Sequence, residues 1–248
     1  MRIISLCPSL TELVCDLGHS RELIACTKFC VYPEKRVRRL LKVGGTKDPK
    51  VEDIVALSPD IVLMNDEENR REDYEALIEA GVDCYSTMPR SIPETAQMVR
   101  SIAAVLGGSP KGEEIAADIE ARSQRVAAAA AEREPTSFAY IIWSKPWMSV
   151  NEDTFAHALL TNAGGVNVFA DRKERYPEIS LEELGEANPD IILLCTEPYP
   201  FKSSDVVDLA AEIDVSMGRI FIADGEYLSW HGSRTPAGID YAESLIVG

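Results

Sequence analysis

Hydrophobic residues in this chain form short continuous runs that are separated by amphipathic stretches. Residues 61–64 and 191–195 are apolar throughout and have the length of buried strands, whereas residues 70–80 carry apolar positions at helical spacing. The same alternation continues along most of the chain, with glycine, proline and acidic residues at the boundaries. Strands that alternate with helices predict parallel sheets, so the pattern indicates an α/β fold with Rossmann-like units.

One helix–strand pattern occurs twice, 130 residues apart. Residues 51–64 read VEDIVALSPDIVLM and residues 181–194 read LEELGEANPDIILL. The identical pairs are Glu52/Glu182, Pro59/Pro189, Asp60/Asp190, Ile61/Ile191 and Leu63/Leu193. Two copies are too few for a solenoid, which needs at least three. The repeat therefore predicts two similar αβ lobes, an arrangement typical of proteins that hold a ligand between the lobes.

A long helix is expected to connect the two lobes. After the break at residues 107–110, residues 111–134 are rich in Ala, Glu and Arg and contain no proline and no glycine beyond Gly112. A helix of this length would span about 33 Å. We therefore expect an N-terminal lobe over residues 1–108, a linking helix over 109–135 and a C-terminal lobe over 136–248.

Several helix ends carry recognisable signals. Residues 9–12, 91–94 and 180–183 each read as a capping box, with Ser first and Glu fourth. Asp48 followed by Pro49 predicts a cap and a first-turn proline for the next helix. Gly18 is expected to end the first helix.

Composition limits the partners and the compartment. The net charge of −16 argues against nucleic acid and against anionic membrane surfaces. The basic residues of segment 35–42 read as a solvated helix face. No apolar run approaches the roughly 20 residues of a membrane span. The six cysteines are irregularly spaced and no leader is recognisable, which favours the cytoplasm; a periplasmic or cell-surface protein is the alternative if a leader is missing.

Candidate chemistry lies in the loops that follow the strands. In open parallel sheets, ligands gather outside the carboxyl ends of the strands. These loops are rich in polar and aromatic side chains, notably Lys28, Tyr32, Asp66, Glu67, Glu68, Trp147, Tyr199, Tyr227, Trp230, His231 and Arg234. Their concentration at one predicted edge indicates a ligand site there.

Four segments together resemble a known superfamily. They are RIISLCPSLTEL, TKFCVYP, VGGTKDPKVEDIVALSPDIVL and AGGVNVF, in this order along the chain. They resemble the class III periplasmic-binding-protein superfamily, which includes the cobalamin, ferric-siderophore and haem receptors of ABC importers, a subgroup described as helical backbone metal receptors. The resemblance implies two Rossmann-like lobes joined by one long helix, with a metal-containing ligand in the cleft and little hinge closure.

The resemblance also assigns aromatic ligand contacts. Tyr32, Tyr176 and Trp147 match positions at which cobalamin receptors present aromatic rings to the ligand. Two further tryptophans of those receptors fall at Thr46 and Asn65 here, and Asn65 is followed by three acidic residues. This departure favours a smaller or more cationic metal complex than cobalamin, so the expected ligand is cobalamin-like or an iron chelate.

Further candidates come from the residue chemistry. The run that contains Trp230, His231 and Arg234 is polar and follows a strand, so His231 is a candidate axial metal ligand and Arg234 a partner for an anionic ligand group. Cys30 is the second candidate metal ligand. Lys28 and Glu68 complete the expected ligand-binding set.

Two acidic residues are candidates for docking to a permease. In the resembled family, one acidic residue near a helix start in each lobe contacts arginines of the ABC permease, and Glu52 and Glu182 match these positions. Both would also stabilise their helix dipoles without any partner.

The alternative to a binding protein is a metal-dependent or cofactor-modifying enzyme on the same scaffold, although no G-x-S-x-G elbow, Walker loop or HExxH motif is present.

Overall fold

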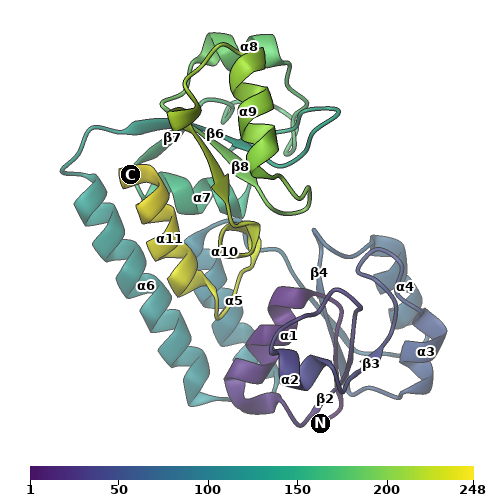
Figure 1. Cartoon of the computed structure of the whole chain (residues 1–248). Helices are drawn as coiled ribbons and strands as arrows, with labels where there is room; N and C mark the ends of the chain where they lie inside the picture. Colours follow the sequence, from purple (N-terminus) through teal and green to yellow (C-terminus); the bar gives the residue numbers. More distant parts are fainter. The chain divides into compact units, whose positions relative to one another are not determined.

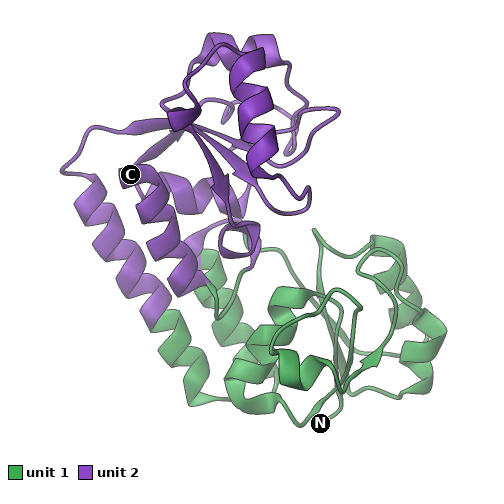
Figure 2. Ribbon diagram, in the orientation of Figure 1, with its two compact units in different colours: residues 1–89, 94–117, 231–234 green, residues 90–93, 118–230, 235–248 purple.

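The computed structural model describes residues 1–248 and divides into two compact units (Figure 2). Unit 1 comprises residues 1–89, 94–117 and 231–234, and unit 2 comprises residues 90–93, 118–230 and 235–248. None of the helices combines the length and the apolar composition that a membrane span needs.

Unit 1 is built on a five-stranded sheet in which every pair of neighbours is parallel (Figure 1). Its strands are β1 (Ile3–Ser5), β2 (Leu23–Cys26), β3 (Leu41–Lys42), β4 (Ile61–Asn65) and β5 (Cys84–Thr87), in the order β3-β2-β1-β4-β5. Its helical elements are α1 (Pro8–Val14), the π-turn Cys15–His19, α2 (Glu34–Val37), α3 (Val51–Ala56), α4 (Arg71–Glu79) and most of α5 (Ile92–Val105).

Successive residues of the unit 1 strands β1 and β4 point to opposite faces of the sheet and are buried on both, so helices must cover both faces. Ile4 of β1 and Val62 of β4 pack with Ile54 of α3 and Leu77 of α4 in one buried cluster. The intervening strand residues, such as Leu63, are also fully buried. A parallel strand that is buried on both faces reads as a continuous apolar run, and this is the pattern from which the strands were predicted.

Unit 2 contains a four-stranded parallel sheet in the order β7-β6-β8-β9. Its strands are β6 (Thr136–Ile141), β7 (Gly165–Asn167), β8 (Ile191–Cys195) and β9 (Ile220–Ala223). Its helices are α7 (Phe155–Asn162), α8 (Leu181–Ala187), α9 (Ser203–Glu212), the short 3-10 turn Met217–Arg219, α10 (Gly225–Ser229) and α11 (Thr235–Val247). The predicted α/β class with parallel sheets is confirmed in both units.

The sequence repeat has a structural cause. In each unit the Asp of the Pro-Asp pair ties the repeated segment to the first strand: Asp60 accepts a hydrogen bond from the Arg2 backbone N–H at 2.6 Å, and Asp190 accepts one from Ser137 at 2.8 Å. The repeated helices α3 and α8 are each followed by a left-handed residue, Ser58 (φ 45°) and Asn188 (φ 44°). The two copies therefore share their turn and their strand anchor as well as their apolar pattern.

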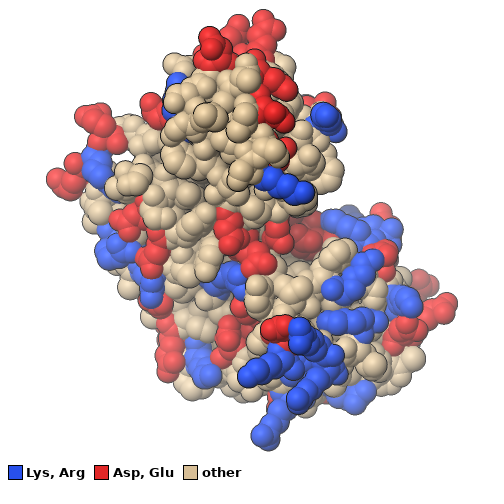
Figure 3. All heavy atoms as spheres, viewed as in Figure 1, with Lys and Arg blue, Asp and Glu red and all other residues tan.

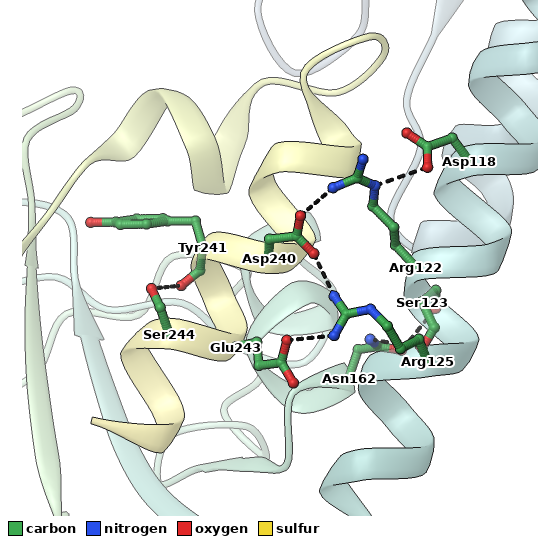
Figure 4. A network of polar contacts seen from close by, with 9 residues as sticks. All are labelled: Asp118, Arg122, Ser123, Arg125, Asn162, Asp240, Tyr241, Glu243 and Ser244. Carbon is green, nitrogen blue, oxygen red and sulfur yellow. Dashed lines mark hydrogen bonds and ion pairs between the residues drawn. The ribbon is translucent and has the colours of Figure 1, made fainter.

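The predicted long helix is α6 (Pro110–Ala130), which begins in unit 1 and ends in unit 2 (Figures 1 and 2). In unit 2 it is bonded to α11 by a network of ion pairs (Figure 4). Asp240 of α11 accepts hydrogen bonds from Arg122 and Arg125 of α6, and Arg125 also bonds Glu243 at 2.9 Å. This network attaches the last helix of the chain to the connecting helix.

Two predicted helix starts are wrong. The capping box at residues 9–12 does not form, because Pro8 begins α1 and leaves Ser9 inside the first turn. The helix expected from Pro49 begins two residues later, after Lys50. The capping box at Ser180 is confirmed, with reciprocal bonds between Ser180 and Glu183 at 2.8 and 3.0 Å.

Candidate functional site

Each sheet has one point at which the strand order reverses, and there two neighbouring strands lead to loops that diverge. In unit 1 this point lies between β1 and β4, and in unit 2 between β6 and β8. Ligands of open α/β sheets bind outside the carboxyl ends of the strands at such points. The loops after these four strands are therefore where a site is expected.

The loops of unit 2 carry a cluster of four aromatic rings, here called the aromatic cluster. Trp143 and Trp147 follow β6, and Tyr199 and Phe201 follow β8. Trp143 meets Tyr199 edge-on, with ring centroids 5.5 Å apart, and Tyr199 contacts Phe201 at 4.5 Å. Phe201 in turn stacks on Trp147 at 5.9 Å, with 10° between the ring planes. Two loops that are distant in sequence are thus joined by ring contacts.

The aromatic cluster has a buried part and an exposed part. Phe201 is 4% exposed and, with Trp147, packs on the apolar core that includes Leu194. Trp143 is 38% exposed. The buried Phe201 and the half-buried Trp147 therefore hold the loops in place, whereas part of the Trp143 ring is accessible to solvent.

The two other aromatic candidates of unit 2 lie in different surroundings. Trp230 is 7% exposed, and its indole N–H donates to the Glu197 carboxylate at 3.0 Å. Trp230 thereby fixes the side chain of a residue in the loop after β8. Tyr176 is half-buried, and the Arg175 guanidinium lies 5.9 Å from its ring centre.

The corresponding loops of unit 1 are polar and acidic. Asn69 ties three of them together, because its amide nitrogen donates to Leu6 O at 3.1 Å and to Thr46 O at 2.9 Å while its oxygen accepts from Asn65 N. The Asn65 side chain accepts from the N–H groups of Glu67 and Glu68 at 3.0 and 3.2 Å. These two asparagines shape the acidic loop at a position where the resembled receptors have an aromatic residue.

The side chain of Glu68 in this loop is partly buried. Burial raises the pKa of its carboxyl group, and the neighbouring Glu67 raises it further, while Lys47 opposes the change. The nearby Cys7 thiol is also buried, which raises its pKa to about 12. The Glu68 carboxyl group and the Cys7 thiol therefore stay neutral up to a higher pH than they would in an exposed loop.

Tyr32 and Arg234, both predicted ligand contacts, are brought together in unit 1. The Arg234 guanidinium lies 4.7 Å from the Tyr32 ring centre and bonds both carboxylate oxygens of Glu12, at 2.8 and 2.9 Å. Tyr32 is 40% exposed. Glu12 thus neutralises Arg234, and Arg234 supports the tyrosine ring from one side.

Lys28, Cys30 and His231 complete the predicted set. Lys28 is exposed, 3.6 Å from Asp48 and over the Phe29 ring. His231 is 5% exposed, and Cys30 is 2% exposed. The structure contains no group of three or more His, Cys, Asp and Glu side chains able to hold a metal ion. Metal ligation by His231 or Cys30 therefore stays a prediction.

The sulfur of Cys30 has a specific polar environment. It accepts a hydrogen bond from the Thr11 hydroxyl at 3.1 Å and lies 3.2 Å from the Thr27 hydroxyl. A hydrogen bond from Cys26 and the contacts with Thr11 and Thr27 lower the pKa of the Cys30 thiol below its ordinary value. All six cysteines are free.

Glu52 and Glu182, the predicted docking residues, occupy equivalent places in the two units. Both lie in the first turn of their helix, α3 and α8 respectively, and both are exposed. Neither side chain forms a hydrogen bond or an ion pair within the chain. They are therefore available to a partner.

Sequence reasoning missed the outer ring of the aromatic cluster. Tyr199 is among the predicted loop aromatics, whereas Trp143 and Phe201 receive no role from the sequence. The available signal was the coincidence of aromatic residues just after two apolar runs of the predicted C-terminal lobe. Knowledge that β6 and β8 are adjacent turns this coincidence into a contact.

The chain belongs to the periplasmic binding protein family, whose model matches residues 3–212. Among curated proteins, it is similar to the vitamin B12-binding proteins of Vibrio cholerae and Vibrio parahaemolyticus. The identities are 26% and 28% over 191 residues, which cover 77% of this chain and 69% of each relative. The resemblance stated from the sequence is thus confirmed.

Solved structures show the same fold. The periplasmic vitamin B12 binding protein BtuF of Vibrio cholerae superposes with a TM-score of 0.85 at 22% identity, covering 98% of this chain and 95% of that one. The periplasmic heme-binding protein RhuT from Roseiflexus gives 0.83 at 25% identity, covering 98% of both chains. The predicted two-lobed fold is confirmed.

These comparisons also bear on function and compartment. They support the binding-protein interpretation over the enzyme alternative. The solved proteins are described as periplasmic, which fits the periplasmic or cell-surface alternative. The cytoplasmic expectation gains no support.

Proposed function

We propose that this protein binds a metal-containing macrocycle, a cobalamin-like corrinoid or a haem-like iron chelate, as the substrate-binding component of an ABC importer outside the cytoplasmic membrane. Its relatives bind vitamin B12 or heme, as their names state. The observation that carries the proposal is the aromatic cluster at the carboxyl ends of β6 and β8.

The aromatic cluster suits a flat, largely apolar ligand. Trp143 offers an exposed indole ring whose orientation is fixed by Tyr199, and Tyr199 is fixed by the buried Phe201. A preorganised ring loses little conformational freedom when a ligand stacks on it. Stacking on a planar macrocycle is the interaction that such a surface provides best.

Unit 1 carries candidate ligand contacts of its own. Tyr32 presents a ring that is backed by Arg234, and Glu68 and Lys28 offer polar contacts of opposite charge. Because Arg234 already bonds Glu12 through two hydrogen bonds, its contribution would be to position Tyr32. A ligand that carries amide or cationic groups would suit the acidic loop at residues 66–68.

Docking to a permease is proposed through Glu52 and Glu182. Their exposed, unpaired carboxylates lie at matching places in the two repeated helices, so they form a pair that arginines of a permease could contact. Replacing both with Arg is expected to abolish import of the ligand while leaving the ligand affinity of the purified protein unchanged. Loss of ligand affinity in this variant, or normal import, would contradict the docking role.

The binding proposal is tested by spectroscopy of the purified protein. Absorbance spectra and elemental analysis would be recorded as purified, and again after titration with cyanocobalamin and with hemin. The expected result is saturable binding of one of the two compounds in a one-to-one ratio, with a shifted absorbance band. Failure of both compounds to bind would overturn the macrocycle proposal, and metal-dependent turnover of a substrate would favour the enzyme alternative.

A further inference from the structure

Basic residues in this acidic protein are concentrated in one segment of unit 1. Residues 28–50 contain eight of the 25 Lys and Arg residues and two of the 41 Asp and Glu residues, and therefore carry a charge of +6. The rest of the chain carries −22. Figure 3 shows the Lys and Arg atoms gathered over unit 1 in the region of α2. The sign of the charge is thus reversed locally.

Seven of these eight side chains are exposed, and we call them the basic patch. They are Lys28, Lys35, Arg38, Arg39, Lys42, Lys47 and Lys50. Lys35 and Arg39 form no hydrogen bond or ion pair through their side chains. The eighth residue, Arg36, is half-buried and donates to the carbonyl oxygens of Ser20 and Leu23, which anchors α2 beneath the patch.

The ion pairs within the basic patch neutralise it only weakly. Lys28 lies 3.6 Å from Asp48, Lys50 lies 3.9 Å from Asp53, and Arg38 pairs with Glu34; both members of each pair are more than half exposed. Exposed pairs of this kind are easily exchanged for other partners. Most of the positive charge is therefore available to an external anion.

Apolar side chains are exposed in the same segment. Leu41 is 58% exposed between Arg39 and Lys42, and Phe29 and Val31 are 52% and 45% exposed. Leu41 and Lys42 form β3, which is bonded only to β2 and is the outermost strand of its sheet. Clusters of Lys and Arg are attracted to anionic lipid surfaces, and apolar side chains beside them add binding when they are buried at the headgroup boundary.

We propose that the basic patch binds the surface of a membrane that contains anionic phospholipids. Charges are screened over about 10 Å at ordinary ionic strength, so a nearby surface responds to the patch and not to the net charge of the molecule. The phosphodiester groups of the lipids complement the cations, and Leu41 and Phe29 enter the headgroup layer. This goes beyond ligand binding and does not depend on which macrocycle is bound.

The test is flotation of the purified full chain with phospholipid vesicles. Vesicles of phosphatidylcholine mixed with phosphatidylglycerol are compared with pure phosphatidylcholine, at low and at moderate salt. The variant Lys35→Glu/Arg39→Glu removes the two unpaired cations. The control Lys111→Glu/Lys173→Glu changes the net charge equally at exposed lysines outside residues 28–50.

We expect the wild-type chain to bind the anionic vesicles at low salt, less at moderate salt, and not to bind pure phosphatidylcholine. The patch variant is expected to lose at least about tenfold in partitioning, whereas the control keeps most of it. Absence of wild-type binding, or equal losses in both variants, would overturn the proposal. Retention on an acidic polypeptide column without vesicle binding would instead assign the patch to an acidic protein. Circular dichroism and the macrocycle titration, run on the same variants, separate this result from misfolding and from failure of the ligand proposal.

Discussion

Asp190 shows how one carboxylate can hold a repeat in register. It accepts hydrogen bonds from both the backbone N–H and the hydroxyl of Ser137, at 2.8 and 2.7 Å, and these bonds lower its pKa below the ordinary 3.8. The ionised form is thus favoured by folding. Its stabilising contribution is complete above the unfolded-state pKa and is lost as pH falls through the lower folded-state value.

Asp190→Asn is therefore expected to lower the free energy of unfolding by about 1 kcal/mol at neutral pH, a modest value because the site is near the solvent. The difference from wild type should shrink as pH falls below about 3.8. Urea unfolding over a pH series measures this. Asp171→Asn, at an exposed position without a partner, is the control. A difference that does not change with pH would contradict the role of the ionised carboxylate.

Cys30 is expected to be the most acidic thiol of the chain. Hydrogen bonds from Cys26, Thr11 and Thr27 lower its pKa below the ordinary thiol value, whereas burial raises the pKa of Cys84 and Cys195 to about 11. The ultraviolet absorbance of thiolate should therefore show a component that titrates at lower pH than an ordinary thiol.

That component should disappear in Cys30→Ser and move to higher pH in Thr11→Val, which lacks the donor hydroxyl. Serine in place of Cys84 is the control and should leave it unchanged. A wild-type titration without any thiolate below pH 8 would contradict the assignment.

At the scale of elements, the attachment of α11 to α6 depends on Asp240. It accepts from both Arg122 and Arg125, and the three side chains are between 38% and 53% exposed, so solvent screens the network in part (Figure 4). Asp240→Asn is expected to lower the free energy of unfolding by about 1 kcal/mol, and less at high salt. A double-mutant cycle with Arg125→Gln measures the coupling; additive effects would show that the pair contributes nothing specific.

Strands and long helices could be predicted from the sequence because they are buried on both faces or have strong helical composition. Residues 61–64 and 191–195 are examples, and so is α6. The capping signal at residues 9–12 failed because α1 begins earlier, at Pro8. Glu12 instead bonds Arg234, which lies more than 200 residues away in sequence, and no local pattern predicts that contact. The short β3 has no alternation to detect and forms because β2 offers a free edge.

The candidate site was predicted in outline but not in detail. Tyr32 and Arg234 were both selected from their loops, yet their contact and the neutralising role of Glu12 depend on the fold. Trp143 was missed because its orientation depends on a ring contact with Tyr199, which lies in the loop after another strand, β8. The spatial order of the strands in each sheet decides which loops lie next to each other, and this order cannot be read directly from the sequence.

At the scale of the whole molecule, the two repeated units carry matching exposed glutamates, and unit 2 carries a preformed aromatic surface. The proposed role, a binding protein that docks to a permease, rests on these features. The affinity of that surface depends on Trp143 in this account. Its replacement by Ala removes the exposed ring, whereas its replacement by Phe keeps an aromatic face.

The most direct measurement is the dissociation constant for the macrocycle that the wild-type chain binds, compared with those of Trp143→Ala and Trp143→Phe. We predict that Trp143→Ala weakens binding by about 10- to 100-fold and that Trp143→Phe retains most of the affinity. Unchanged affinity in Trp143→Ala, with the protein folded as judged by circular dichroism, would contradict the claim that the aromatic cluster is the ligand-binding surface.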